Sequence, residues 1–303
     1  MRILLTGSCG YLGSVLTPTL LAAGHKVLAL DSLERGGQGL AACCHDPNFE
    51  FVRGDCREDQ TIARALKGCD AVIPLAGVVG VNACKRDERR AWETNLGAIK
   101  TLLRFRSRDQ LLLFPMTNSG YGTKTGQAEC DEDTPLEPIS VYGQSKCQAE
   151  RAVLDCENTV SLRLATVFGM SPAMRWDLLV NDLTRRAVLD RHLILFEGHY
   201  RRNFVHIRDV ADCFRFFVEG KQYPGHKRVF NLGNDSANCT KTQLADLVAR
   251  IVGDVYVHSA EVGIDPDKRD YVVSNQRLRE AGFEAKRGLE EGIREVCKGV
   301  ALL

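Results

Sequence analysis

The sequence RILLTGSCGYLGSVLTPTLLAAGHKVLALD, residues 2–31, decides the fold of this chain. Residues 2–7 form a short apolar run that is typical of a buried parallel strand. A turn with glycines three residues apart follows, at Gly7, Gly10 and Gly13. Residues 14–23 then predict a helix, which the glycine after them ends. A strand, a glycine turn and a helix in this order predict a dinucleotide site, with the pyrophosphate at the positive end of the helix.

A second strand is predicted at residues 26–30, and it ends at Asp31. An acid about 20 residues past the glycines suits a ribose 2′-hydroxyl and repels a 2′-phosphate, so NAD is favoured over NADP. Arg35 lies close by and weakens that preference. Pro18 removes a backbone hydrogen bond inside the predicted helix and is expected to kink or wedge it. A glycine-rich turn beside a surface aspartate is the structural alternative.

Tyr142 and Lys146 are four residues apart, which places both side chains on one face of a helix. An ammonium beside a phenol favours the phenolate and lowers the tyrosine pKa from its ordinary value near ~10. Such a tyrosine can take a proton from a sugar or alcohol hydroxyl while hydride leaves the same carbon. The same spacing is common on solvated helix faces, so the catalytic interpretation depends on the glycine turn in the same chain.

The composition excludes several function classes. The 303 residues include 40 basic and 39 acidic ones, a net charge of +1, so no general attraction to nucleic acid or to an anionic membrane is expected. No apolar run reaches the ~18 residues of a membrane span, and a strand follows Met1 directly, so we expect a cytoplasmic protein. The twelve cysteines are scattered without metal-ligand spacing. We therefore predict no metal site and mostly buried free thiols.

The first half of the chain alternates apolar runs with helical stretches, the pattern of a doubly wound parallel sheet. Further strands are predicted at 49–53, 71–75, 111–116 and 160–164. Further helices are predicted at 61–66, 91–106 and 140–155. The sequence thus predicts an α/β fold with a Rossmann sheet.

The pattern changes after Gly169. A loop and a helix are predicted over 170–190, helices at 210–219 and 241–252, and strands at 204–207, 229–232 and 255–258. We predict a NAD-binding domain at residues 1–169, to which 205–235 return. Residues 170–303 are predicted to form a smaller α/β region that binds substrate.

The glycine turn and the Tyr142-x-x-x-Lys146 pair together resemble the extended short-chain dehydrogenase/reductases, and within them the NAD-dependent nucleotide-sugar epimerase/dehydratase family. The resemblance covers nearly the whole chain. It implies that NAD lies along the turn, including Tyr11 and Leu12. It also implies that Asp55 and Cys56 hold adenine and that Asn95 braces the active-site helix. Leu75, Ala76 and Gly77 match a loop over the cofactor, although Pro74 replaces the family's usual histidine.

The family places a serine or threonine after the fifth strand, where it bonds the reacting oxygen. Thr117 stands at that position, with Ser119 as a weaker candidate. The family's 4,6-dehydratases read Thr-Asp-Glu here, whereas this chain reads Thr117-Asn118-Ser119 and lacks both carboxyl groups. The cysteine and histidine of the 3,5-epimerising members are also missing from the matching positions. The resemblance therefore implies oxidation and reduction of one carbon, C4 of the sugar, without elimination of water.

The second half resembles the nucleotide-sugar face of the family. Asn181 corresponds to an asparagine that contacts the substrate phosphates. Arg202 aligns with an arginine that forks onto the pyrophosphate, a geometry that suits arginine better than lysine. Arg269 is a candidate second clamp, and Arg175 a candidate contact to the sugar or nucleotide, as Asn118 and Ser119 are. Surface ion pairs are the structural alternative for each arginine.

The leading hypothesis is a NAD-dependent nucleotide-sugar 4-epimerase that works through a transient 4-keto sugar. Release of that keto sugar would instead make the enzyme a 4-dehydrogenase or, in reverse, a 4-ketoreductase. A non-catalytic NAD-bound sensor on the same fold is a third possibility. The resemblance also implies a homodimer, formed by the helices that carry residues 95–105 and 142–154.

Overall fold

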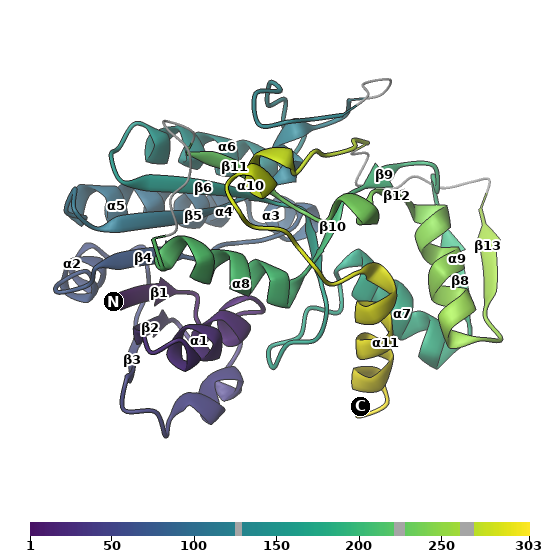
Figure 1. Ribbon diagram of the computed structural model, residues 1–303, viewed down its shortest axis with the longest axis horizontal. Coiled ribbons are helices and arrows are strands. Elements are labelled where there is room, and N and C mark those ends of the chain that lie inside the picture. Colours follow the sequence, from purple (N-terminus) through teal and green to yellow (C-terminus); the bar gives the residue numbers. More distant parts are fainter. Residues whose placement is uncertain (125–128, 221–227, 261–269) are drawn as a thin grey trace.

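The computed structural model describes residues 1–124, 129–220, 228–260 and 270–303. Its centre is a seven-stranded sheet in the order β11-β6-β5-β4-β1-β2-β3 (Figure 1), in which all neighbouring strands are parallel. The strands are β1 (Arg2–Thr6), β2 (Lys26–Asp31), β3 (Phe49–Arg53), β4 (Ala71–Pro74), β5 (Leu111–Thr117), β6 (Thr159–Leu164) and β11 (Val229–Leu232). This confirms the predicted doubly wound parallel sheet.

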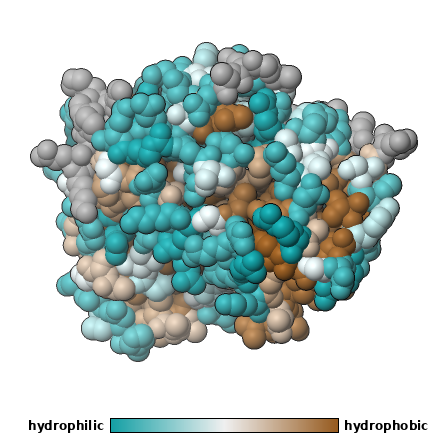
Figure 2. All heavy atoms as spheres, turned by 45° about the vertical axis from the view of Figure 1, so that its right-hand side comes forward, coloured by the Kyte–Doolittle hydropathy of each residue, from teal (hydrophilic) through white to brown (hydrophobic). Residues whose placement is uncertain are grey.

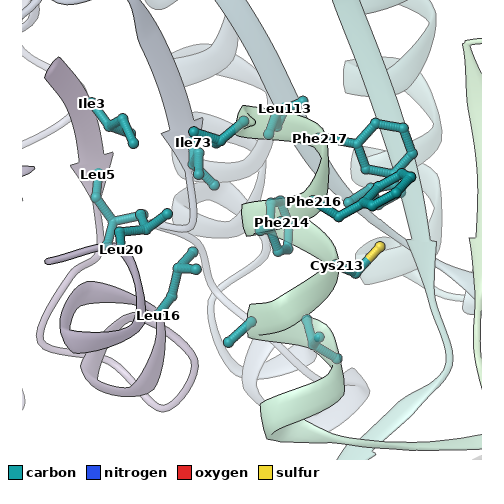
Figure 3. Packing of buried hydrophobic residues seen from close by; sticks show 14 of the residues in the cluster. Ile3, Leu5, Leu16, Leu20, Ile73, Leu113, Cys213, Phe214, Phe216 and Phe217 are labelled. Carbon is teal, nitrogen blue, oxygen red and sulfur yellow. The ribbon is translucent and has the colours of Figure 1, made fainter. Parts of the chain in front are cut away.

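Helices cover both faces of the sheet, and β1 shows why. Its alternate side chains point to opposite faces: Ile3 and Leu5 pack with α1 (Gly13–Ala22) and α8 (Ile207–Val218), while Leu4 packs with helices of the other layer. Figure 3 shows Leu5 next to Leu20 of α1, and Ile73 and Leu113 between β1 and the phenylalanines of α8. The other layer consists of α2 (Asp59–Ala65), α5 (Ala98–Phe105) and α6 (Val141–Leu154).

Shorter elements complete the sheet domain. They are the helices α3 (Val81–Arg86) and α4 (Glu88–Trp92), the π-helical η2 (Glu93–Gly97), and the 3-10 turns η1 (Gln38–Cys43), η3 (Asn118–Tyr121) and η4 (Asp235–Ala237). Helix α1 continues through Pro18 without interruption. The predicted helix at 91–106 is instead divided among α4, η2 and α5, and the wider π turn of η2 directs Asn95 inward.

A smaller region lies to the right of the sheet in Figure 1. Its own core lies among α7 (Leu179–Asp190), α9 (Lys241–Val252) and α11 (Leu289–Val300). The remaining elements are α10 (Gln276–Glu280) and the strand pairs β7–β10 (Thr166–Phe168, Phe204–His206), β8–β13 (His192–Leu195, Tyr256–Ser259) and β9–β12 (Arg201–Arg202, Cys239–Thr240).

The surface on the side of this smaller region is mixed, with hydrophobic areas among mostly hydrophilic ones (Figure 2). Ile194, Phe196 and Tyr256 are among the exposed apolar side chains. Among the described residues, no helix combines the length and the apolar character that crossing a bilayer requires. Of the twelve cysteines, Cys44 is exposed, and most of the others are buried as free thiols.

Candidate active site

A cavity of about 910 Å³ opens at the carboxyl ends of the parallel strands. Ligands of doubly wound sheets bind at this edge, because the loops that follow the strands meet there. The cavity brings together residues predicted separately along the chain. These are Gly7, Gly10, Tyr11, Leu12, Gly13, Asp31, Asp55, Cys56, Leu75, Ala76, Gly77, Asn95, Thr117, Ser119, Tyr142, Lys146, Arg175 and Arg202.

The glycine turn leaves no room for a side chain at Gly7 or Gly13. Gly7 has a φ of +69°, and a Cβ on it would lie 2.5 Å from the backbone nitrogen of Ala76. A Cβ on Gly13 would lie 2.5 Å from the carbonyl oxygen of Gly7. The backbone therefore lines the cavity directly here, and α1 begins at the turn, so the positive end of its dipole lies at the cavity wall. This arrangement fits the pyrophosphate of NAD.

Asp31 ties the turn to the next loop. Its carboxylate accepts hydrogen bonds from the backbone nitrogens of Cys9, at 2.9 Å, and Leu33, at 2.8 Å. These bonds hold a negative charge in the cavity wall at the end of β2. That position fits the ribose hydroxyls of NAD, and a 2′-phosphate would meet electrostatic repulsion.

Asp55 and Cys56 follow β3, and both face the cavity. A hydrogen bond from Arg57, 2.6 Å long, holds the pKa of the Asp55 carboxyl below its ordinary value. Burial raises the pKa of the Cys56 thiol to about 12, so it is neutral. Arg57 also lines the cavity, and the sequence analysis did not identify it. Its proximity to Asp55 in the sequence could have indicated this contact.

Asn95 links the loop after β4 to helix α6. Its amide oxygen accepts a bond from the backbone nitrogen of Val78, at 2.9 Å, and its nitrogen donates to the hydroxyl of Ser145, at 3.1 Å. Only 2% of Asn95 is exposed. The amide therefore holds the predicted cofactor loop, with Gly77 packed against it, at a fixed place relative to α6.

Helix α6 positions Tyr142 and Lys146 on the cavity wall. It begins after Ser140, whose hydroxyl accepts a hydrogen bond from the backbone nitrogen of Gly143 and caps the helix. The Lys146 ammonium lies 4.2 Å from the centre of the Phe114 ring. Burial lowers the pKa of Lys146 to about 7. The lysine can therefore hold its charge or release a proton close to neutral pH.

Thr117 ends β5 within the same cavity. Its hydroxyl donates to the hydroxyl of Ser119, at 3.0 Å, and accepts a hydrogen bond from the Ser119 backbone nitrogen. Asn118, between them, is turned away from the cavity and is 1% exposed. Among the described residues, neither polar atom of its amide has a hydrogen-bond partner.

Arg175 faces the cavity in a fixed orientation, because its guanidinium donates two bonds to Asp177, at 2.7 and 2.5 Å. That pairing holds the pKa of Asp177 below its ordinary value. Asn181 lies behind this loop and does not line the cavity. Its amide bonds the backbone of Gly169 and Arg175 and the hydroxyl of Tyr11. Burial raises the pKa of that Tyr11 phenol, so Tyr11 stays protonated.

Arg202 and Lys241 line the wall contributed by the smaller region. Sequence patterns indicated Arg202 but not Lys241, because the pairing of β9 with β12, two short strands far apart in the sequence, is what brings the start of α9 to the cavity. Arg269, predicted as a second clamp, lies outside the described residues.

Comparisons with known proteins agree with this geometry. Residues 3–233 match the model of the NAD dependent epimerase/dehydratase family. A UDP-glucose 4-epimerase of Mycolicibacterium smegmatis is 28% identical over 97% of this chain and 96% of its own length. A dTDP-glucose 4,6-dehydratase of Streptomyces niveus is 25% identical over 98% of this chain and 92% of its own. The Thermus thermophilus UDP-glucose 4-epimerase, solved in complex with NAD, superposes with a TM-score of 0.84 at 24% identity and covers 99% of both chains.

Proposed function

The chain belongs to the NAD dependent epimerase/dehydratase family, and from that premise we propose that it is a nucleotide-sugar 4-epimerase. The observation that carries the proposal is the joint position of Thr117, Tyr142 and Lys146 in one cavity with the glycine turn. Three groups that can hold or move a proton thus face the cavity in which the residues fit NAD. Relatives named as UDP-glucose 4-epimerases support the same reaction class.

Each group has a role that follows from its chemistry. Tyr142 takes the proton of the sugar 4-hydroxyl, and the Thr117 hydroxyl bonds the same oxygen. Lys146 stabilises the phenolate by its charge and binds the ribose of the cofactor. NAD, bound along the glycine turn, supplies the capacity to accept a hydride from C4 and to return it. If the keto sugar rotates in the site and takes the hydride back on its other face, the product is the 4-epimer.

The residues beside Thr117 argue against dehydration. Elimination of water needs an acid and a base beside the sugar, and the family's dehydratases use two carboxyl groups there. This chain has Asn118 and Ser119 at those positions. Neither an amide nor a hydroxyl titrates near neutral pH, so neither replaces a carboxyl pair. This difference from the pattern of the family's dehydratases supports epimerisation over elimination of water.

The test is a panel of UDP-, GDP-, CDP- and dTDP-hexoses incubated with the purified protein and followed by NMR and by NADH absorbance. We expect one sugar to be inverted at C4 without accumulation of NADH. A Tyr142→Phe variant should lose this turnover, whereas Tyr256→Phe, at a tyrosine 69% exposed, should retain it. A released keto sugar with persistent NADH would indicate a 4-dehydrogenase or 4-ketoreductase. No turnover, with ligand-dependent binding of a partner, would indicate a sensor.

We further propose a homodimer, formed through the surface of α5 and α6. The large apolar side chain of Phe105, at the end of α5, is 40% exposed, and a dimer would cover it. Light scattering of the purified protein tests this directly. A mass twice that of the chain supports the dimer, and the mass of one chain contradicts it.

A further inference from the structure

A two-stranded ribbon forms one wall of the cavity and directs two basic side chains into it. In the antiparallel pair of β9 and β12, Arg202 lies opposite Cys239, and the Lys241 backbone nitrogen bonds the carbonyl oxygen of Tyr200, at 3.2 Å. Arg202 and Cys239 share one face of the ribbon, and Lys241 follows β12 directly as the first residue of α9. Arg202 and Lys241 both line the cavity, whereas Arg201, on the opposite face, pairs with Asp270.

Lys241 occupies a place that is unfavourable for a cation. It is the first residue of the 12-residue helix α9, where the positive end of the helix dipole opposes a positive charge. Only 6% of the residue is exposed, so its ammonium has lost most of its hydration. The ammonium donates to the carbonyl oxygen of Phe196, at 3.0 Å, and lies 5.8 Å from the Tyr200 ring centre. These contacts hold the ammonium in place, and Lys241 lines the cavity together with Arg202.

We infer that Lys241 binds the diphosphate of the nucleotide-sugar substrate together with Arg202. This inference rests on the proposed function. Arg202 can fork onto one phosphate through two N–H groups, while Lys241 acts as a point charge for the other. Each phosphate group then receives one cation. The positive end of the α9 dipole, which disfavours a positive charge at Lys241, also favours an anion beside it.

A structural role and a ligand-binding role for Lys241 predict opposite effects of its replacement on stability. If the lysine served mainly to stabilise the fold, its replacement by methionine, which keeps a similar stem, would destabilise the protein. If it serves a ligand, the ligand-free protein should be at least as stable without the charge. Arg250, exposed in the last turn of the same helix, provides a matched control for the loss of a positive charge from α9.

The experiment is calorimetric titration of the full-length holoenzyme with UDP, GDP, CDP and dTDP, and with the corresponding nucleosides. For the diphosphate that wild type binds most tightly, Lys241→Met should weaken affinity by about 10- to 100-fold. Affinity for the nucleoside and the NAD content should not change. The Tm of Lys241→Met without added nucleotide should equal or exceed that of wild type, and Arg250→Met should bind like wild type.

Three results would overturn the inference. A change in diphosphate affinity of less than about 2-fold would remove Lys241 from the substrate site, while turnover by wild type would leave the proposed function intact. A lowered Tm with equal loss of diphosphate and nucleoside affinity would indicate a structural lysine. Failure of wild type to bind any of the four diphosphates would contradict the proposed function itself, and the inference with it.

Discussion

Asn95 and Ser145 are joined by a hydrogen bond of 3.1 Å that connects the loop after β4 to helix α6. The Ser145 hydroxyl donates in turn to the carbonyl oxygen of Tyr142, at 3.0 Å. The other polar atom of the Asn95 side chain holds Val78 of the loop. One buried amide therefore sets the position of the loop after β4 relative to the helix that carries Tyr142 and Lys146.

Replacement of Asn95 should reduce both stability and activity. Asn95→Ala leaves the Val78 backbone nitrogen without its partner, and the Val78 carbonyl oxygen keeps only the bond from the Cys84 thiol, so the free energy of unfolding should fall by about 1–3 kcal/mol. Ser145→Ala removes the bond to Asn95 and the bond to the Tyr142 carbonyl oxygen, leaves the loop contacts of Asn95 in place, and should cost about 1 kcal/mol. Denaturant unfolding measures both values. Equal stability of Asn95→Ala and wild type would contradict the proposed bracing.

Lys146 should make the stability of the cofactor-free protein depend on pH. Burial lowers its folded pKa to about 7 from 10.5. Between these two values the unfolded chain binds more protons, so stability rises as the pH increases. Lys146→Met lacks this dependence. The variant should therefore be more stable than wild type at pH 6, and its advantage should shrink toward pH 9, as measured by thermal unfolding. A constant difference between the two proteins would count against a buried ammonium.

Gly7 and Gly24 should respond very differently to alanine, although both have positive φ values, +69° and +80°. Both variants carry the backbone strain of about 1–2 kcal/mol. Gly7→Ala also places a Cβ 2.5 Å from the Ala76 nitrogen, which adds about 1–3 kcal/mol. No heavy atom lies within 4 Å of a Cβ on Gly24. Denaturant unfolding and NAD content should separate them: only Gly7→Ala should lose the cofactor. Loss of NAD from both variants would indicate that general destabilisation of the fold, and not the clash at Gly7, releases the cofactor.

Thr117 should matter more for turnover than Ser119. Thr117→Val keeps the shape of the side chain and removes the hydroxyl, so kcat should fall by about 10²-fold or more. Thr117→Ser should restore most of the activity. Ser119→Ala removes only the neighbouring acceptor and should have a smaller effect on kcat. If Ser119 carried the proton instead, Ser119→Ala would lower kcat more than Thr117→Val does.

The residues predicted for the nucleotide half of the site come from local patterns, and the structure brings them to one cavity. The turn at residues 7–13 and the pair Tyr142 and Lys146 are short-range features, because a strand or a helix fixes their geometry within a few residues. The alternation of strands and helices in the first half likewise matched the sheet. Pro18 was tolerated because α1 packs against α8, and tertiary packing outweighs a single missing hydrogen bond.

Features that depend on long-range contacts were missed. Helix α11 was not predicted because glycines interrupt its pattern, and Gly292 is needed where the helix packs closely on Phe168. The wall with Lys241 forms from two strands of two residues each, far apart in the sequence. Asn181 illustrates a further limit: its position in the chain suggested a substrate contact, whereas its amide bonds Tyr11, Gly169 and Arg175 behind the cavity.

The central claim is that a hydride leaves C4 of the sugar and returns to the same carbon on the other face. The most direct test uses the nucleotide sugar that the panel identifies, synthesised with deuterium at C4 and incubated with the enzyme in ordinary water. We predict a 4-epimer that retains deuterium at C4, with no net NADH. Product with a solvent hydrogen at C4, or a released keto sugar with stoichiometric NADH, would contradict the account.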